Sequence, residues 1–96
     1  MSYKGIFTNA FRKDLKSIHK KNPKDLELIV HSIEQKLLLD PFSDDTKQLQ
    51  CFEFFRYRVG KYRIVFELTD SDTIAFLAVD SRASIYTKLR HRFNKC

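Results

Sequence analysis

The sequence predicts an α+β fold in which an antiparallel sheet of about four strands is covered on one face by an N-terminal helical hairpin. Apolar side chains recur at helical spacing between residues 9 and 40. Residues 54–67 have the alternation of a β-hairpin, and residues 73–79 are a continuous apolar run typical of a strand covered on both faces. With a short first strand over residues 2–8, the expected order is β-α-α-β-β-β and a short C-terminal helix, within one domain spanning residues 1–96.

Charge and cysteine content limit the classes of function. The chain has 96 residues, with 18 lysines and arginines against 12 acidic residues, a formal net charge of +6 and a pI near 9.5. This balance suits a nucleic acid, an anionic membrane surface or an acidic protein as partner. The two cysteines lack the spacing of a disulfide framework or a zinc site, and Cys51 is interpreted as a packing residue. We therefore expect a reduced, cytoplasmic setting and no metal or cofactor. No segment has the apolar length of a signal peptide or a membrane span, so we expect no membrane contact.

Capping signals delimit the two N-terminal helices. Thr8 or Asn9 can begin the first helix by accepting a hydrogen bond from an unpaired backbone amide. Asn22 and Pro23 begin the second helix, because asparagine is a good cap and proline has no amide to leave unpaired at the first helical position. Asp40-Pro41 ends the second helix, since proline disfavours helical geometry in the residue before it.

The hairpin has predicted strands at about residues 50–59 and 61–68, preceded by a polar connector over residues 41–48. Gly60-Lys61 forms the turn, because glycine supplies the positive φ that a type II′ turn needs at its first central position. The turn sets a register of five opposed pairs: Val59–Tyr62, Arg58–Arg63, Tyr57–Ile64, Arg56–Val65 and Phe55–Phe66. Aromatic and aliphatic side chains then share the face that packs on the helices.

The other face of the hairpin carries Arg56, Arg58 and Arg63. Arg58 and Arg63 are directly opposed, and like charges at such positions repel each other unless an anion lies between them. Solvated arginines with their stems on apolar surface are the simpler interpretation. We favour an anion site, because three guanidinium groups converge and arginine can bind phosphate or carboxylate through two parallel hydrogen bonds.

More candidate residues follow the apolar strand. Arg82 comes just after it, and Tyr86 lies four residues further, about one helical turn. Loops at strand ends commonly present functional groups. Arg82 could instead pair with Asp80, and Tyr86 could seal the end of the sheet. If this strand pairs with the hairpin, however, Arg82 and Tyr86 join the three arginines around one concavity. The basic tail that follows, over residues 90–96, is expected to be frayed.

These residues carry a resemblance to a known family. The segment from Phe55 to Phe66, with its arginine–valine–glycine turn and tyrosine–arginine return strand, resembles the RelE/ParE superfamily of bacterial toxins, as does Arg82-Ala83-Ser84-Ile85-Tyr86. The Phe11-Arg12-Lys13-Asp14-Leu15 helix matches as well, so the resemblance extends over nearly the whole chain. It implies a RelE-like fold and the toxin half of a type II toxin–antitoxin pair.

The resemblance also implies an activity and roles for individual residues. RelE-like members cleave messenger RNA, commonly in the ribosomal A site, by metal-independent attack of the 2′-hydroxyl on the phosphate. Arg63 is then expected to hold the scissile phosphate, Arg82 to stabilise charge or assist the leaving group, and Tyr86 to stack on a base or donate its hydroxyl. The residues expected to bind the RNA backbone are Arg56, Arg58 and Lys61.

The chain departs from the ribonuclease members in two ways. Many of them place a histidine before the strand-end arginine, where this chain has Ser81, and others use lysines where it has Arg56 and Arg58. A guanidinium group is a poor base because it stays protonated. The candidate proton acceptors are Asp44, Asp45, Glu67 and His91, and none of them stands out from its sequence position.

Three functions therefore stay open: a RelE-type endoribonuclease, a ParE-type poison of DNA gyrase, which needs no base, and a homologue that binds an antitoxin without being toxic. For each, the resemblance implies a cognate antitoxin that is acidic and partly helical, buries apolar surface and covers the basic groove. We expect a monomeric free toxin and a hetero-oligomeric toxin–antitoxin complex.

Overall fold

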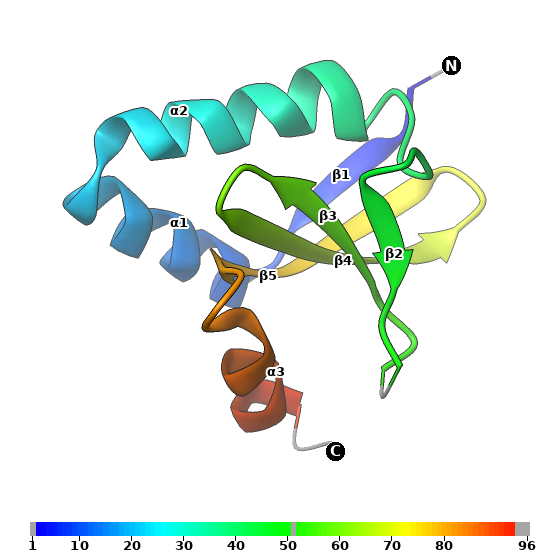
Figure 1. Ribbon diagram of the computed structural model, residues 1–96. Coiled ribbons are helices and arrows are strands. Elements are labelled where there is room, and N and C mark those ends of the chain that lie inside the picture. Colours follow the sequence, from blue (N-terminus) through cyan, green and yellow to red (C-terminus); the bar gives the residue numbers. More distant parts are fainter. Residues whose placement is uncertain (1, 51, 94–96) are drawn as a thin grey trace.

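The computed structural model describes residues 2–50 and 52–93 (Figure 1). The elements are β1 (Lys4–Phe7), α1 (Asn9–Lys21), α2 (Pro23–Ser32), β2 (Thr46–Gln48), β3 (Phe55–Val59), β4 (Tyr62–Asp70), β5 (Thr73–Ser81) and α3 (Ile85–Phe93). A π-helical turn over Ile33–Leu37 continues α2. The predicted α+β architecture is confirmed, with α1 and α2 as the N-terminal helical hairpin and α3 projecting from the side of the sheet opposite α2 (Figure 1).

The sheet has five strands in the order β1-β5-β4-β3-β2. The predicted antiparallel β5–β4 and β4–β3 pairs are confirmed. The β3–β2 pair is antiparallel as well, whereas β1, expected in an antiparallel sheet, pairs with β5 in parallel. The fifth strand is the short β2, which forms within the segment predicted to be a polar connector. Three polar residues give no alternation to read, so their strand character comes from pairing with β3 and not from their own sequence.

The helix starts follow the predicted caps, whereas the helical turns that continue α2 end at Leu37, before the predicted stop at Asp40-Pro41. The Thr8 hydroxyl accepts a hydrogen bond from the amide of Phe11 and so begins α1. The Asn22 side chain accepts hydrogen bonds from the amides of Lys24 and Asp25, and proline occupies the first turn of α2. These caps fix the sharp turn between the helices, which lets both lay their apolar faces on the sheet.

Two apolar clusters hold the layers together. The larger one lies between the helical hairpin and one face of the sheet, and its fully buried members include Phe11, Ile29, Ile33, Ile64, Phe66 and Phe76. The smaller one lies on the opposite face, where Ile85 and Leu89 of α3 pack on Val65, Leu77 and Ala78. The arginine face of the hairpin is therefore partly covered by α3, and the start of this helix is held beside the arginines.

Polar side chains attach α3 to the edge of β5. Pairing with β1 ends at Phe76, so within the described residues the rest of β5 has no strand neighbour on that side. Asp14 of α1 accepts a hydrogen bond from the Val79 amide (3.1 Å), while Arg92 donates to the Leu77 carbonyl (2.9 Å). Arg92 and Lys88 of α3 both donate to the Asp14 carboxylate, at 2.9–3.0 Å. Burial alone raises the pKa of Asp14, but these hydrogen bonds outweigh it and hold the pKa below its usual value.

Two further local predictions are wrong. Residues 50–54 were predicted to start a hairpin strand, but the described part of this segment is a loop, because the chain must turn between β2 and β3; the Leu49 amide donates to the Phe54 carbonyl across it. The tail was predicted to fray from residue 90, yet α3 continues to Phe93, whose ring packs on Phe54 with 4.9 Å between centroids.

Cys51 and Cys96 lie outside the described residues. None of the helices in the described part of the chain has the length and apolar character needed to cross a membrane.

Candidate functional site

The β3–β4 hairpin has the register predicted from its turn. All five opposed pairs are confirmed, including Arg58 opposite Arg63 and Arg56 opposite Val65. Gly60 adopts a φ of +56°, the positive value that the predicted turn requires. Because directly opposed residues of an antiparallel pair lie on the same face, Arg56, Arg58 and Arg63 share the face on which α3 packs.

The carboxylate of Asp45 contacts this arginine face. Its Oδ1 accepts hydrogen bonds from Nε and Nη2 of Arg58, at 3.1 and 2.7 Å. Its backbone carbonyl accepts from the Arg58 amide (3.0 Å) and from Nη1 of Arg56 (3.4 Å). Of the predicted proton acceptors, Asp45 is therefore the one that binds Arg56 and Arg58. Glu67 lies further along β4, opposite Ala75, and Asp44 and His91 are solvent-exposed.

Arg63 lies among three other arginines, and Arg56, Arg58, Arg63 and Arg82 are together called the arginine cluster. Its Nη1 donates to the carbonyls of Gly60 and Tyr62, at 2.9 Å each, so the guanidinium folds back over the turn. Burial lowers the pKa of Arg63, and the positive charges of Arg56, Arg58 and Arg82 lower it further, while Tyr86 acts in the opposite direction. The structure thus brings five of the six predicted site residues together.

Arg82 is anchored through its backbone. Its amide donates to the Lys61 carbonyl (2.8 Å), which ties the turn after β5 to the hairpin turn. The alternative pairing with Asp80 is not observed: the Asp80 carboxylate binds Lys88 at 3.1 Å and the Ser81 amide at 2.8 Å. Within the described residues, the Arg82 side chain makes no hydrogen bond or ion pair, and it is exposed.

Lys61 does not join the cluster. Its ammonium group lies 3.4 Å from the Asp25 carboxylate of α2 and over the Tyr62 ring. The Tyr62 hydroxyl donates to the same carboxylate at 2.5 Å, which, with burial, raises the pKa of Tyr62 to about 12. These three residues tie the hairpin turn to α2 on the helix side of the sheet. The predicted RNA-binding role of Lys61 therefore lacks the support that the other five residues receive.

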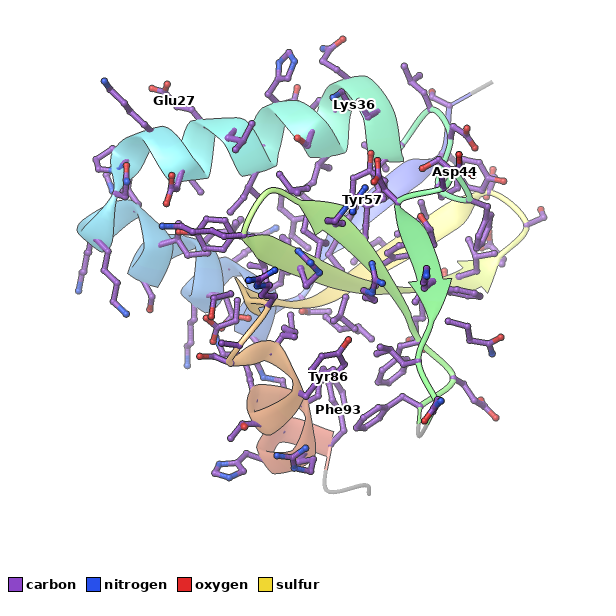
Figure 2. The ribbon with its side chains drawn as sticks, in the orientation of Figure 1. Glu27, Lys36, Asp44, Tyr57, Tyr86 and Phe93 are labelled. Atoms are coloured by element: carbon purple, nitrogen blue, oxygen red, sulfur yellow. The ribbon has the colours of Figure 1, made fainter. Side chains whose placement is uncertain are left out.

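A cavity of about 420 Å³ adjoins the cluster, lined by residues 47–50, Phe52, Arg56, Tyr86 and Arg90. Tyr86, at the start of α3, is 43% exposed, and Figure 2 shows its side chain between α3 and the strands β2 and β3. Arg56 and Tyr86 belong both to the cavity and to the surroundings of Arg63. The predicted site did not include Lys47, Gln48, Gln50 and Arg90, because they lie in segments predicted to be a connector, a strand and a frayed tail.

Comparison with known proteins identifies the family. Residues 6–86 match the model of the ParE toxin of the type II toxin–antitoxin system parDE. The chain belongs to this toxin family. The RelE/ParE resemblance predicted from the hairpin and from the segment Arg82–Tyr86 is thereby confirmed. No curated protein is similar in sequence to the toxin at a significant level.

Solved structures agree with this assignment. A chain of the RelBE2 toxin–antitoxin complex from Mycobacterium tuberculosis is 30% identical, with a TM-score of 0.72, and the match covers 85% of the toxin and 100% of that chain. A chain of the RelB–RelE complex from Methanococcus jannaschii is 33% identical, with a TM-score of 0.58 and coverage of 86% and 96%. The YoeB/ParE toxin from Agrobacterium tumefaciens shares the fold, with a TM-score of 0.69 at 15% identity and coverage of 82% and 98%.

Proposed function

We propose that this toxin is an endoribonuclease that cleaves messenger RNA in association with the ribosome and so inhibits translation and growth. The observation that supports this proposal is that Arg56, Arg58 and Arg63 share one face of the hairpin, with Arg82, from the turn after β5, and Tyr86 among the groups around Arg63. Four guanidinium groups are costly to place together unless their ligand is an anion. A chain of phosphodiesters is such a ligand, and Tyr86 offers its bases an exposed aromatic ring.

The proposed reaction is attack of a ribose 2′-oxygen on the neighbouring phosphorus. The 2′-hydroxyl loses its proton to an acceptor, the new O–P bond forms, the P–O5′ bond breaks, and the 5′-oxygen takes up a proton. The products are a 2′,3′-cyclic phosphate and a 5′-hydroxyl end. Arg63 and Arg82 stabilise the negative charge that builds up on the phosphate oxygens, which is the contribution that preorganised donors make best.

Asp45 is the proposed proton acceptor. Before RNA binds, its carboxylate is held by Arg58 at 2.7 Å. This ion pair is exposed, with 58% of the Arg58 side chain and 39% of the Asp45 side chain accessible, and such pairs contribute little stability. A phosphate that takes over Arg58 releases the carboxylate beside the bound nucleotide. Asp80, opposite Arg63 across β4 and β5, is less available because Lys88 holds it.

The proposal includes a cognate antitoxin. The matched RelBE2 and RelB–RelE structures are toxin–antitoxin complexes. This chain has a net charge of +6 and leaves apolar side chains exposed on the helical side, among them Leu28 and Leu39 at 47% and 55%. An acidic, partly helical segment suits both features, since it can cover apolar surface and neutralise the arginines. In the cell, the free toxin is then a cytoplasmic monomer and the inhibited toxin a hetero-oligomer.

The test uses purified toxin, ribosomes and a translated message. Wild-type toxin is expected to cut the message, and Arg63→Ala is expected to cut it at least about 100-fold more slowly. The matched control is Arg12→Ala, an exposed arginine on α1, outside the hairpin and the turn after β5 that carry the cluster, which should cut as the wild type does. Messages that stay intact at doses of wild-type toxin that arrest growth would overturn the proposal.

A ParE-type action on DNA gyrase is the second candidate. It is favoured by the match to a ParE toxin model and by the few proton acceptors near the arginines: in the described part of the chain, Asp45 is the one carboxylate that pairs with a cluster arginine, Arg58. This function is one of binding and needs no proton acceptor. Induced DNA breaks with intact messages would select it, whereas normal growth on induction without antitoxin would indicate a non-toxic homologue.

A further inference from the structure

Asp80 and Arg63 lie directly opposite each other in the β4–β5 register, yet their side chains do not pair. Directly opposed residues share a face of the sheet, where opposite charges attract and a carboxylate fits a guanidinium group through two parallel hydrogen bonds. Nη1 of Arg63 donates instead to two backbone carbonyls, and no carboxylate in the described part of the chain forms an ion pair with Arg63. The register therefore places opposite Arg63 an internal anion able to compete with a phosphate.

The Asp80 carboxylate is held by Lys88 of α3. Its Oδ2 lies 3.1 Å from the Lys88 ammonium group, and its Oδ1 accepts a hydrogen bond from the Ser81 amide at 2.8 Å. Both carboxylate oxygens therefore have a donor other than Arg63. Without Lys88, Asp80 would keep the Ser81 amide alone, and the cation directly opposed to it in the sheet would be Arg63.

Lys88 is itself fixed in place. Besides its contact with Asp80, its ammonium group donates to the buried Asp14 carboxylate at 3.0 Å and to the Val79 carbonyl at 3.4 Å, so each of its three N–H groups has an oxygen to bind. The Lys88 side chain is 26% exposed and that of Asp80 31%, so water and salt screen this pair less than the open Arg58–Asp45 pair. Lys88 can therefore keep its carboxylate under conditions in which Arg58 exchanges its own.

We propose that Lys88 is a positioning residue that keeps Asp80 from pairing with Arg63, so that the Arg63 guanidinium group stays available for a phosphate. Lys88 acts through Asp80 and needs no contact with the RNA. This inference rests on the proposed ribonuclease function for the identity of the anion that Arg63 binds. The hold of Lys88 on Asp80 is tested without RNA.

The first experiment follows the free toxin by NMR, through the Nε–H signal of Arg63 and the carboxylate carbon of Asp80. Lys88→Met should displace both signals, because Asp80 then pairs with Arg63. Adding Asp80→Asn should return the Arg63 signal close to its wild-type position, although the double variant has lost the same contact with Asp14. An Arg63 signal that stays in place in Lys88→Met, or stays displaced in the double variant, would overturn the proposal.

The fold should tolerate these variants, because Asp14 keeps its hydrogen bonds from Arg92 and from the Val79 amide when Lys88 is replaced. Lys88→Gln is the second variant for the same comparison. It removes the charge and still offers Asp14 a hydrogen-bond donor, so it serves where Lys88→Met does not fold.

The second experiment measures RNA affinity in a double-mutant cycle. A labelled single-stranded RNA is titrated with wild-type toxin, Asp80→Asn, Lys88→Met and the double variant, and binding is followed by fluorescence anisotropy. While Lys88 holds Asp80, Asp80→Asn should change the affinity less than about twofold. In the Lys88→Met background the same replacement should raise the affinity about fivefold, because it removes the carboxylate that occupies Arg63. Equal effects in the two backgrounds would contradict the proposal, since a lost charge or a purely structural role of Lys88 gives additive changes.

Lys13→Met is the matched control for the loss of one lysine charge, because Lys13 is exposed on α1. Lys88→Met should lower the RNA affinity about fivefold, and Lys13→Met less than about twofold. Equal losses in the two variants would show that Lys88 acts through its charge alone and would overturn the proposal. If wild-type toxin binds no RNA, the proposed ribonuclease function fails, and the NMR comparison still decides whether Lys88 keeps Asp80 from Arg63.

Discussion

Arg58 and Arg63 lie directly opposite each other on β3 and β4, and each guanidinium group is held by oxygen atoms of the protein itself. Arg58 binds the carboxylate of Asp45, while Arg63 binds the carbonyls of Gly60 and Tyr62. These internal partners offset the repulsion between the two charges in the absence of a ligand. The contacts of Arg58 are exposed and easily exchanged, so a phosphate can replace Asp45 with little loss of stability.

Asp45→Asn separates the two roles proposed for this residue. Removing the carboxylate frees Arg58, so single-stranded RNA should bind about three- to tenfold more tightly, as expected from the loss of one exposed ion pair. Removing the proton acceptor should slow single-turnover cleavage about 100-fold or more. Affinity is measured by fluorescence anisotropy with a labelled RNA, and cleavage with saturating toxin.

Asp44→Asn is the matched control, because Asp44 is exposed and is the neighbouring carboxylate in the sequence. It should leave both quantities near the wild-type values. Tighter binding by Asp45→Asn without slower cleavage would show that Asp45 competes with phosphate but does not take the proton. Another group, such as Asp80, would then have to be tested in that role.

Asp14→Asn should destabilise the fold by about 3 kcal/mol, because it leaves Arg92 and Lys88 without the buried carboxylate that both contact. The measurement is chemical unfolding followed by circular dichroism. Asp70→Asn is a suitable control, since Asp70 is an exposed carboxylate at the β4–β5 turn. Its replacement should cost less than about 1 kcal/mol.

The ion pairs of Asp14 should also make the stability of the fold fall at acid pH. In the folded chain the pKa of Asp14 lies below its ordinary value of 3.8, because Arg92, Lys88 and the Val79 amide favour the ionised form against the effect of burial. The ion pairs therefore stabilise fully above that ordinary value, and their contribution is lost as the pH falls through the lowered pKa. Asp14→Asn should flatten the fall of stability below pH 4; a wild-type slope in this variant would contradict the assignment.

Tyr62→Phe tests the link between the hairpin turn and α2. The hydroxyl donates to Asp25, and this hydrogen bond raises the pKa of Tyr62 to about 12. The stabilisation from this hydrogen bond is fully present below pH 10.0, the ordinary pKa of the tyrosine hydroxyl, and it is lost as the pH rises toward 12. The variant should melt roughly 5 °C lower at neutral pH and show less alkaline destabilisation between pH 10 and 12. An equal loss of stability with pH in both proteins would show that another group titrates there.

Local features made much of the fold predictable. Gly60 determined the turn, and the alternation around it determined every opposed pair of the hairpin, because a shift by one residue would exchange its apolar and arginine faces. Thr8 and Asn22 placed the helix starts through their own side chains. The arginine cluster followed from the same alternation, once β5 was expected to pair with the hairpin.

Long-range contacts determined the parts that the sequence did not reveal. The strand character of β2 comes from pairing with β3, and the parallel pairing of β1 with β5 depends on chain segments about 70 residues apart. The length of α3 depends on Phe93 packing on Phe54 and on Arg92 reaching Asp14. For the same reason the cavity was missed, because Lys47 and Arg90 meet only after β2 and α3 have been placed.

The central claim is that the arginines on the hairpin and after β5 form one site for RNA phosphates. It is tested most directly by the salt dependence of single-stranded RNA binding for wild-type toxin, Arg58→Ala, Arg63→Ala, Arg82→Ala and the Arg12→Ala control. If each cluster arginine contacts a phosphate, its loss should reduce the slope of log K against log salt concentration by about 0.7, while the control keeps the wild-type slope. Slopes that stay at the wild-type value in all three cluster variants would contradict the claim.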